Sequence, residues 1–218
     1  MELPPADLDR VLGLRDVVVI EGPDAQTYLH SQVSQDLTGM TVGEQRWTFV
    51  LEPTGKVESL ARVTRAGDER FELDTDEGYG EALRARIDRF KIRVQADTSI
   101  GEQFGSAAEE QDRITVGWPR LGAELMPGET LVAGTGVAGI AVSYTKGCYP
   151  GQELVERMAS RAADAPRSIR RLSVPPGTEV GDAVLDGEDD VGVVTSVAGD
   201  TALGWVKRTS QVGTVVQF

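Results

Sequence analysis

Short apolar runs and amphipathic stretches alternate along the first 165 residues. β-Branched or alternating runs that end at glycine or proline predict strands, at 15–21, 45–51, 56–63 and 70–74. The second and third of these runs flank a Pro-Thr-Gly turn and predict a β-hairpin. Apolar residues spaced three or four positions apart predict helices, at 22–37, 80–93 and 151–163. This mixture predicts an α+β fold.

The middle of the chain has weaker patterns. Residues 97–112 are small, polar and acidic, and they predict a linker or loop. Residues 113–136 are interrupted by glycine and proline, and they predict irregular chain over the surface. Residues 137–144 are apolar and β-branched in part, and they predict a strand that leads directly into the segment 143–153. That segment contains the single cysteine of the chain.

The pattern changes after Pro166. Five short strands separated by glycine-containing turns are predicted, at 169–174, 180–185, 191–197, 202–206 and 212–218. Short strands at this spacing are typical of a small antiparallel barrel or sandwich. The sequence therefore predicts a first domain at 1–165 and a C-terminal β-barrel at 166–218.

Composition and charge argue against several classes of function. The 218 residues are 40% hydrophobic, which is ordinary for a globular protein with a core, and the formal net charge is −13. This charge argues against nonspecific binding to nucleic-acid phosphates or to anionic lipid. No apolar run is long enough to cross a bilayer, and the first nine residues lack the features of a signal peptide, so we expect a cytoplasmic protein without a membrane partner. One cysteine and one histidine argue against a transition-metal site built from this chain alone.

The segment 143–153 (SYTKGCYPGQE) carries the strongest chemical signal. Cys148 follows Lys146 by two residues and precedes a predicted helix, so a nearby cation and free backbone N–H groups would favour the thiolate. Glycines on both sides of the cysteine permit a tight, exposed turn. Glu153 would lie in the first helical turn, where it could accept a hydrogen bond from a ligand. The alternative is that Cys148 is a small buried apolar residue and that the glycines only turn the chain.

Residues 146–153 (KGCYPGQE) resemble the signature Lys-Gly-Cys-Tyr-x-Gly-Gln-Glu of the YgfZ family. Members of that family are folate-binding proteins related to the T-protein (aminomethyltransferase) of the glycine cleavage system. Further segments resemble other motifs of the family, at 22–37, 51–56, 89–93, 113–119, 192–196 and 202–208. The resemblance spans nearly the whole chain.

The resemblance implies a T-protein-like folate-binding fold, in which two α+β units and a C-terminal β-barrel surround a central cavity. It implies tetrahydrofolate as the cofactor. It also implies iron–sulfur proteins as partners, including some enzymes that modify tRNA, whose clusters the protein would help to assemble or repair without contacting nucleic acid itself. The functional positions that follow are Cys148 and Lys146 as the reactive pair, and, as folate-binding residues, Tyr149, Gly151, Gln152, Glu153, Arg113 and Trp118.

Two departures from the relatives bear on activity. The T-protein carries a glutamate that contacts the pterin ring, in a stretch that corresponds to 113–117, and Thr115 stands at that position here. The second α+β unit is shortened near 97–112. We therefore expect an accessory protein without classical turnover. The alternatives are a tetrahydrofolate-dependent one-carbon (aminomethyl) transferase and a folate-free scaffold that keeps only the fold.

Other features have both a structural and a functional interpretation. Asp74 and Asp76 are expected to be solvated acids at a strand end rather than an acid–base pair. His30 is expected to be a partly exposed structural residue rather than a proton shuttle. The arginines of 84–93 are expected on a solvated helix face, with binding of the folate polyglutamate tail as the alternative. Trp118 is expected either in the core or as one wall of a ligand pocket.

Overall fold

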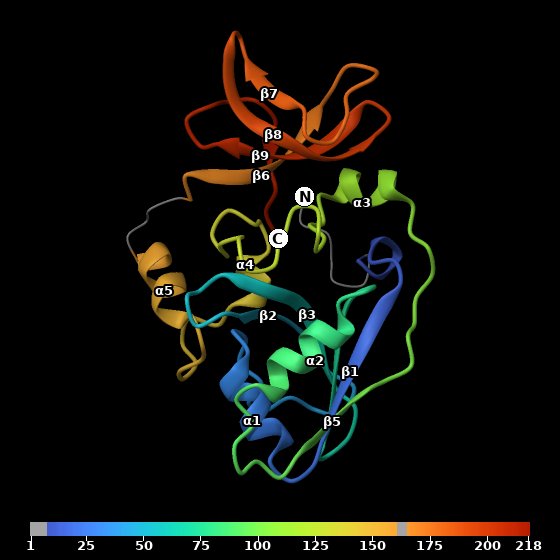
Figure 1. Ribbon diagram of the computed structural model, residues 1–218, viewed down its shortest axis with the longest axis vertical. Helices are drawn as coiled ribbons and strands as arrows, with labels where there is room; N and C mark the ends of the chain where they lie inside the picture. Colours follow the sequence, from blue (N-terminus) through green and yellow to red (C-terminus); the bar gives the residue numbers. More distant parts are fainter. Residues whose placement is uncertain (1–7, 161–164) are drawn as a thin grey trace.

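The computed structural model describes residues 8–160 and 165–218, and its first unit is an antiparallel sheet in the order β2-β3-β4-β1-β5 (Figure 1). β2 and β3 form the predicted hairpin, and β1 pairs with β4 on one side and with β5 on the other. The four strands predicted in this region are therefore confirmed. The strand bounds are β1 (Arg15–Glu21), β2 (Gln45–Leu51), β3 (Val57–Arg65), β4 (Arg70–Asp76) and β5 (Asp97–Ile100).

Two helices, α1 (Ala25–Gln32) and α2 (Gly80–Asp88), cover one face of this sheet (Figure 1). Because successive side chains of a strand point to opposite faces, β1, β2, β3 and β4 each supply apolar side chains to this side. The resulting core is fully buried and includes Val18, Ile20, Leu29, Phe71, Leu73 and Ile87. α2 ends five residues before the predicted end. The chain must turn there to reach β5, and Arg93 adopts a left-handed φ of 56° that a helix cannot contain.

The opposite face of the sheet is partly apolar and partly charged. Its apolar part packs against residues 118–142, and the ring centroids of Trp47 and Trp118 lie 4.5 Å apart. Phe218 packs edge-on against Trp118, so the C-terminus of the chain returns to this core. Trp118 therefore belongs to the core. The charged part is a group of buried side chains that includes Arg15, Arg62, Asp74 and Asp76.

The middle of the chain forms three short helices, α3 (Glu110–Val116), α4 (Ala138–Ala141) and α5 (Gln152–Ser160). Two predictions for this region are wrong. Residues 97–112 are not only a loop, because they contain β5 and the start of α3; β5 is an edge strand with largely exposed side chains, held by backbone hydrogen bonds that need no apolar pattern. Residues 137–144 contain the short helix α4 instead of a strand, since a short apolar run does not distinguish the two structures.

The C-terminal residues form a second antiparallel sheet, in the order β10-β6-β9-β8-β7 (Figure 1). All five predicted strands are confirmed with shifted bounds, whereas closure of this sheet into a barrel stays a prediction. The predicted domain boundary near residue 165 adjoins residues 161–164, which lie outside the described residues. The strand bounds are β6 (Arg167–Ser173), β7 (Ala183–Asp186), β8 (Asp189–Ala198), β9 (Thr201–Lys207) and β10 (Thr214–Val215).

A buried glutamate joins the middle of the chain to the second sheet. Glu124 has no exposed surface, and its carboxylate accepts hydrogen bonds from Arg113 of α3 at 2.9 Å and from Ser196 of β8 at 2.6 Å. Thr195 also donates to this carboxylate, at 2.8 Å. The indole N–H of Trp205 in β9 donates to the Glu124 carbonyl at 2.9 Å. This network fixes α3 and the loop that follows it against the second sheet.

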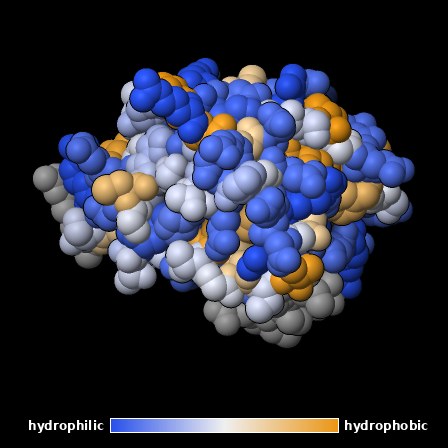
Figure 2. Space-filling model, turned by 90° about the horizontal axis from the view of Figure 1, so that it is seen from below, coloured by the Kyte–Doolittle hydropathy of each residue, from blue (hydrophilic) through white to orange (hydrophobic). Residues whose placement is uncertain are grey.

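The surface at the end of the molecule that carries α1 is mostly hydrophilic (Figure 2). Hydrophobic residues on this face form small separate spots rather than one broad patch. A patch of the size that marks a protein or membrane interface is therefore not seen in this view. Among the described residues, no helix has the length and apolar character needed to span a membrane.

Candidate functional site

The predicted cysteine motif lies in the loop between α4 and α5. Cys148 is exposed, and a Cβ placed on Gly147 beside it would meet no atom within 4 Å. The neighbours on either side, Lys146 and Tyr149, are buried, with 8% and 7% of their surface exposed. The loop therefore presents the thiol to solvent, and the alternative of a buried apolar cysteine is wrong.

The ammonium group of Lys146 points to the end of α1. It donates hydrogen bonds to the carbonyls of His30, Val33 and Gln35, the last two at 2.6 and 3.2 Å. Burial lowers the pKa of Lys146 to about 8. In the described part of the chain, no hydrogen bond joins Lys146 to Cys148, so the structure gives this lysine a different set of partners from the expected one.

Gly151 has a packing role. Gly151 and Gly55 both adopt left-handed φ angles, of 84° and 86°. A Cβ on Gly151 would lie 2.5 Å from the carbonyl oxygen of Glu52 and 2.8 Å from the Cα of Gly55. The turn after β2 and the start of α5 therefore meet backbone to backbone, which brings together the two predicted motifs at 51–56 and 146–153.

Gln152 and Glu153 lie in the first turn of α5. The Gln152 N–H bonds to the Tyr149 carbonyl at 3.3 Å, and its side-chain oxygen accepts the Tyr149 N–H at 3.3 Å. The same side chain donates to Glu156 one turn later, while Glu153 is exposed. The expected free donor at Gln152 is therefore already bonded within its own loop. The Tyr149 hydroxyl is buried and has no hydrogen-bond partner among residues 8–160 and 165–218, and burial raises the pKa of this tyrosine to about 12.

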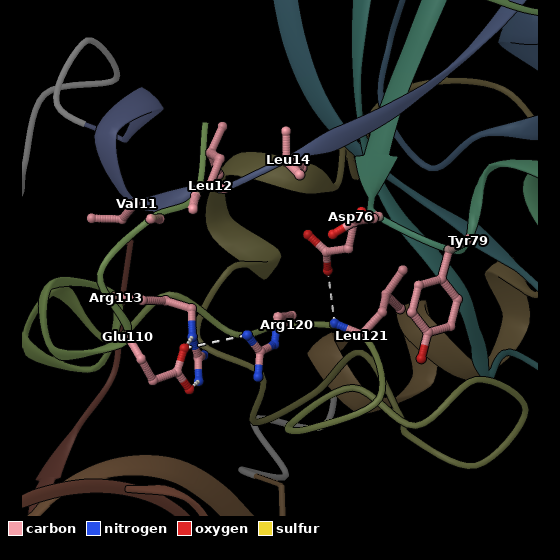
Figure 3. Close-up of a pocket in the computed structure, with 13 residues that line it drawn as sticks. Val11, Leu12, Leu14, Asp76, Tyr79, Glu110, Arg113, Arg120 and Leu121 are labelled. Carbon is pink, nitrogen blue, oxygen red and sulfur yellow. Dashed lines mark hydrogen bonds and ion pairs between the residues drawn. The ribbon is translucent and has the colours of Figure 1, made fainter. Parts of the chain in front are cut away.

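A cavity of about 330 Å³ lies between the end of β4, the segment 11–14 and α3 (Figure 3). Its polar groups come from both sides of this gap. Asp76 accepts the backbone N–H of Leu121 at 2.8 Å, and Arg120 lies 3.3 Å from Glu110 on the opposite wall. Leucine, valine, alanine and tyrosine side chains complete the walls, so the cavity offers carboxylate acceptors, two arginines and apolar surface together.

A second cavity, of about 430 Å³, adjoins the first because Leu12 and Gly13 line both. It lies on the charged part of the sheet. The Arg62 guanidinium lies 5.6 Å from the ring centroid of Trp47 and 5.9 Å from that of Phe104. We call these two spaces the sheet-face cavities. Their walls suit a ligand with a flat polar ring, since aromatic, guanidinium and carboxylate groups face the same space.

The expectation that Asp74 and Asp76 are solvated is wrong. Both are buried, because they occupy inward-facing positions on a strand in the middle of the sheet. Asp74 accepts hydrogen bonds from Arg15 and Arg62, each at 2.9 Å, and Asp76 pairs with Arg15. Burial raises the pKa of Asp76, with Arg15 opposing that shift. The partners come from β1 and β3, distant in sequence, so no local pattern could reveal them.

Arg113 lines the first cavity, but the protein itself uses its donors. They bond to both carboxylate oxygens of Glu110, to Glu124, to Ser196 and to the Trp118 carbonyl. Arg113 is therefore a strut between α3 and the second sheet rather than a free ligand-binding group. Sequence reasoning missed Arg15 and Glu124 as site-forming residues. Their signal in the sequence is weak: Arg15 precedes the apolar run 17–20, and Glu124 stands between Ala123 and Leu125.

Three further expectations have clear outcomes. His30 is partly exposed, and its Nδ1 accepts the Leu37 N–H at 3.1 Å, so its structural role is confirmed. Arg86 is buried and donates to the Leu51 carbonyl at 2.6 Å, so the expectation of a fully solvated arginine face on α2 is wrong. Thr115 is exposed and donates to the carbonyl one helical turn before it, so this position faces solvent.

The structure thus divides the predicted site into the exposed loop that carries Cys148 and the sheet-face cavities. Cys148 lines neither of the sheet-face cavities. It also lines neither of two further cavities, of about 360 and 520 Å³, beside α2 and beside α5. Within 8–160 and 165–218, no group of three or more histidine, cysteine, aspartate or glutamate side chains could hold a metal ion.

Comparison with known proteins identifies which solved structure the fold resembles. No family model matches the chain. An uncharacterized protein of Haemophilus influenzae is 23% identical over an alignment 189 residues long, which covers 68% of this chain and 67% of that protein. The crystal structure of the glycine cleavage system aminomethyltransferase T from Bartonella henselae matches with a TM-score of 0.71 at 14% identity, over 97% of this chain and 87% of that chain. The chain therefore has the fold of the T-protein.

Proposed function

We propose that this protein is a YgfZ-type accessory protein that binds a reduced folate, tetrahydrofolate, in the sheet-face cavities and serves iron–sulfur proteins through Cys148. The observation that carries the proposal is the T-protein fold over nearly the whole chain. The motif KGCYPGQE at 146–153 supports it, because the structure exposes the cysteine of that motif.

The residues of the sheet-face cavities fit a folate. A pterin ring presents an amino group and a ring N–H that suit a carboxylate, and an ionised carboxylate has about four lone-pair sites. Asp76 uses its oxygens on Arg15 and on the Leu121 N–H, so it retains acceptor capacity toward the cavity. Arg120 is half-exposed at the same cavity, where its guanidinium suits the carboxylates of a folate tail. Each cavity has a volume in the range of small-molecule sites.

The exposed thiol supports a role toward iron–sulfur proteins. A thiolate is the ligand that iron–sulfur clusters prefer, and it also forms mixed disulfides with partner cysteines. Either reaction needs a sulfur that a partner protein can reach, as Cys148 provides. The partner would supply the cluster or the second sulfur, since this chain contains a single cysteine.

A folate-dependent one-carbon transferase is the second candidate, and Asp76 is the observation that favours it. This carboxyl is buried, its pKa is raised by burial, and it lines the first sheet-face cavity. Acids with such properties occur often in active sites. Formation of 5,10-methylenetetrahydrofolate from an aminomethyl donor, lost in Asp76→Asn, would establish this candidate in place of the accessory role.

Titration calorimetry with tetrahydrofolate under reducing conditions tests the folate site. We expect saturable binding that weakens about tenfold in Arg120→Gln, because one charge-assisted hydrogen bond is lost. Arg157→Gln, an equal charge change on the exposed part of α5, is the control and should bind as the parent does. Absence of heat at millimolar ligand would favour a folate-free scaffold.

Complementation tests the thiol. In a strain that lacks the protein and shows reduced iron–sulfur enzyme activity, the parent gene should restore activity and Cys148→Ser should not. Thr145→Ser, an exposed change in the same loop, should restore it fully. Full rescue by Cys148→Ser would remove the sulfur from the mechanism.

A further inference from the structure

The loop that displays Cys148 is held by the residues on either side of its tip. Gly147 and Cys148 are exposed, whereas Lys146 and Tyr149 are buried. The Tyr149 ring belongs to the core between the first sheet and residues 118–142. Lys146 points in another direction, toward α1. Two buried anchors therefore flank a two-residue tip that carries the thiol.

The end of α1 needs the donors that Lys146 supplies. The last carbonyls of a helix have no N–H partner within the helix, and they carry partial negative charge. α1 ends at Gln32, and Val33 already has extended angles, with φ −115° and ψ 157°. Lys146 donates to the carbonyls of His30, Val33 and Gln35, so one ammonium group satisfies acceptors within the helix and in the turn that follows it.

The same contacts leave nothing of the ammonium for the thiol. An ammonium group has three N–H donors, and three carbonyls use them here. The titratable groups that act on Lys146 are Asp36 and His30, and the Tyr149 ring lies 5.2 Å from its nitrogen. Both titratable groups belong to α1 and the turn after it. The electrostatic partners of this lysine are thus the elements that it binds.

We propose that Lys146 is a positioning residue that fixes the cysteine loop to the end of α1, so that Cys148 projects into solvent at a constant place. Its charge serves the attachment of the loop and not the acidity of the sulfur. The structural part of this inference stands on the contacts of Lys146 alone. Its consequence for activity rests on the proposed function of Cys148.

Hydrogen exchange and thiol alkylation in Lys146→Met test the proposal together. Methionine keeps most of the apolar stem and removes the donors. We expect amide exchange at 143–150 to become at least about tenfold faster, because charged hydrogen bonds to three carbonyls are lost. The pH midpoint for alkylation of Cys148 by iodoacetamide should stay in place. Lys207→Met, an exposed lysine on the second sheet, is the control and should change neither readout.

Unchanged exchange at 143–150 would overturn the proposal, and so would an alkylation midpoint moved to higher pH, which would assign the lysine to thiol acidity. If Lys146→Met fails to fold, amine labelling of the unmodified protein replaces it. Lys146 should then react at least about tenfold more slowly than Lys207, and equal rates would contradict the anchor. A fully active Cys148→Ser would remove the proposed function while leaving the exchange result valid.

Discussion

Several buried charged residues of this protein pair with residues of other segments of the chain. Arg15 of β1 pairs with Asp74 and Asp76 of β4, and Arg113 of α3 pairs with Glu124. Removing one member of such a pair leaves an uncompensated charge in the interior, which costs several kcal/mol. These side chains therefore constrain the sheet-face cavities from within, whatever ligand binds there.

The ion pair of Glu110 with Arg113 should make the free energy of unfolding depend on pH. Arg113 donates hydrogen bonds to it at 2.7 and 2.9 Å, and these bonds lower its pKa from the usual 4.5. A carboxyl with a lowered folded-state pKa contributes stability above its unfolded pKa and loses it as the pH falls through the folded value. We expect Glu110→Gln to lose less unfolding free energy than the parent between about pH 5 and about pH 3, measured by urea unfolding.

Glu129→Gln is the control for that experiment, because Glu129 is exposed and is not among the hydrogen-bond partners of Arg113. Its unfolding free energy should depend on pH as that of the parent does. Equal acid sensitivity in Glu110→Gln and the parent would show that the Arg113 contact is absent in solution.

Two glycines of the cysteine motif allow a matched test at the scale of elements. Gly151 has a left-handed φ and no room for a Cβ against Glu52 and Gly55, whereas Gly147 has open space around it. We expect Gly151→Ala to reduce the unfolding free energy by about 1–3 kcal/mol, because backbone strain adds to displacement of α5 from the turn. Gly147→Ala should leave it within about 0.5 kcal/mol. Chemical denaturation measures both, and equal effects would contradict the contact.

The elements that could be predicted are those whose side chains carry the signal. β1, β2 and β4 were expected within two residues of their bounds, because β-branched and apolar residues face two buried layers. β5 could not be found, since its partners lie along β1 and its own side chains are exposed. α4 could not be identified, because Val137 to Val142 is too short for periodicity to separate helix from strand.

The candidate site was predictable where it depends on local sequence. The exposure of Cys148 follows from its glycine-flanked loop, and the motif at 146–153 is contiguous. The sheet-face cavities are different, because they combine residues 11–14, the end of β4 and α3. The direction in which the Lys146 side chain points could not be predicted either. Its partners lie more than a hundred residues earlier in the chain, whereas its position two residues before Cys148 suggested that it contacts the thiol.

At the scale of the whole molecule, buried contacts join the middle of the chain to the second sheet. Glu124 makes several of them, since its carboxylate binds Arg113 and Ser196 and its carbonyl binds Trp205. We expect Glu124→Gln to reduce the unfolding free energy by about 3 kcal/mol, because Arg113 loses a buried counter-charge. The single unfolding transition expected of the parent should then broaden or divide in two, as followed by circular dichroism.

Glu129→Gln again provides the control, since it changes the same residue type five positions later on the exposed side of the loop. It should leave both the midpoint and the width of the transition as in the parent. A Glu124→Gln transition as sharp as that of the parent would show that the two sheets are coupled by other contacts, such as the edge-on packing of Phe218 on Trp118.

The indole of Trp205 reports on this junction optically. Its N–H donates to the carbonyl of Glu124, where the middle of the chain meets the second sheet, while the other two tryptophans pack against each other at a tilt of 53° in the core of the first unit. Separation of the second sheet would hydrate Trp205 and shift its fluorescence to longer wavelength, and subtracting the spectrum of Trp205→Phe would isolate this signal from that of Trp47 and Trp118. Emission spectra of the parent and of Trp205→Phe would thus follow opening of the junction in real time, without any added label.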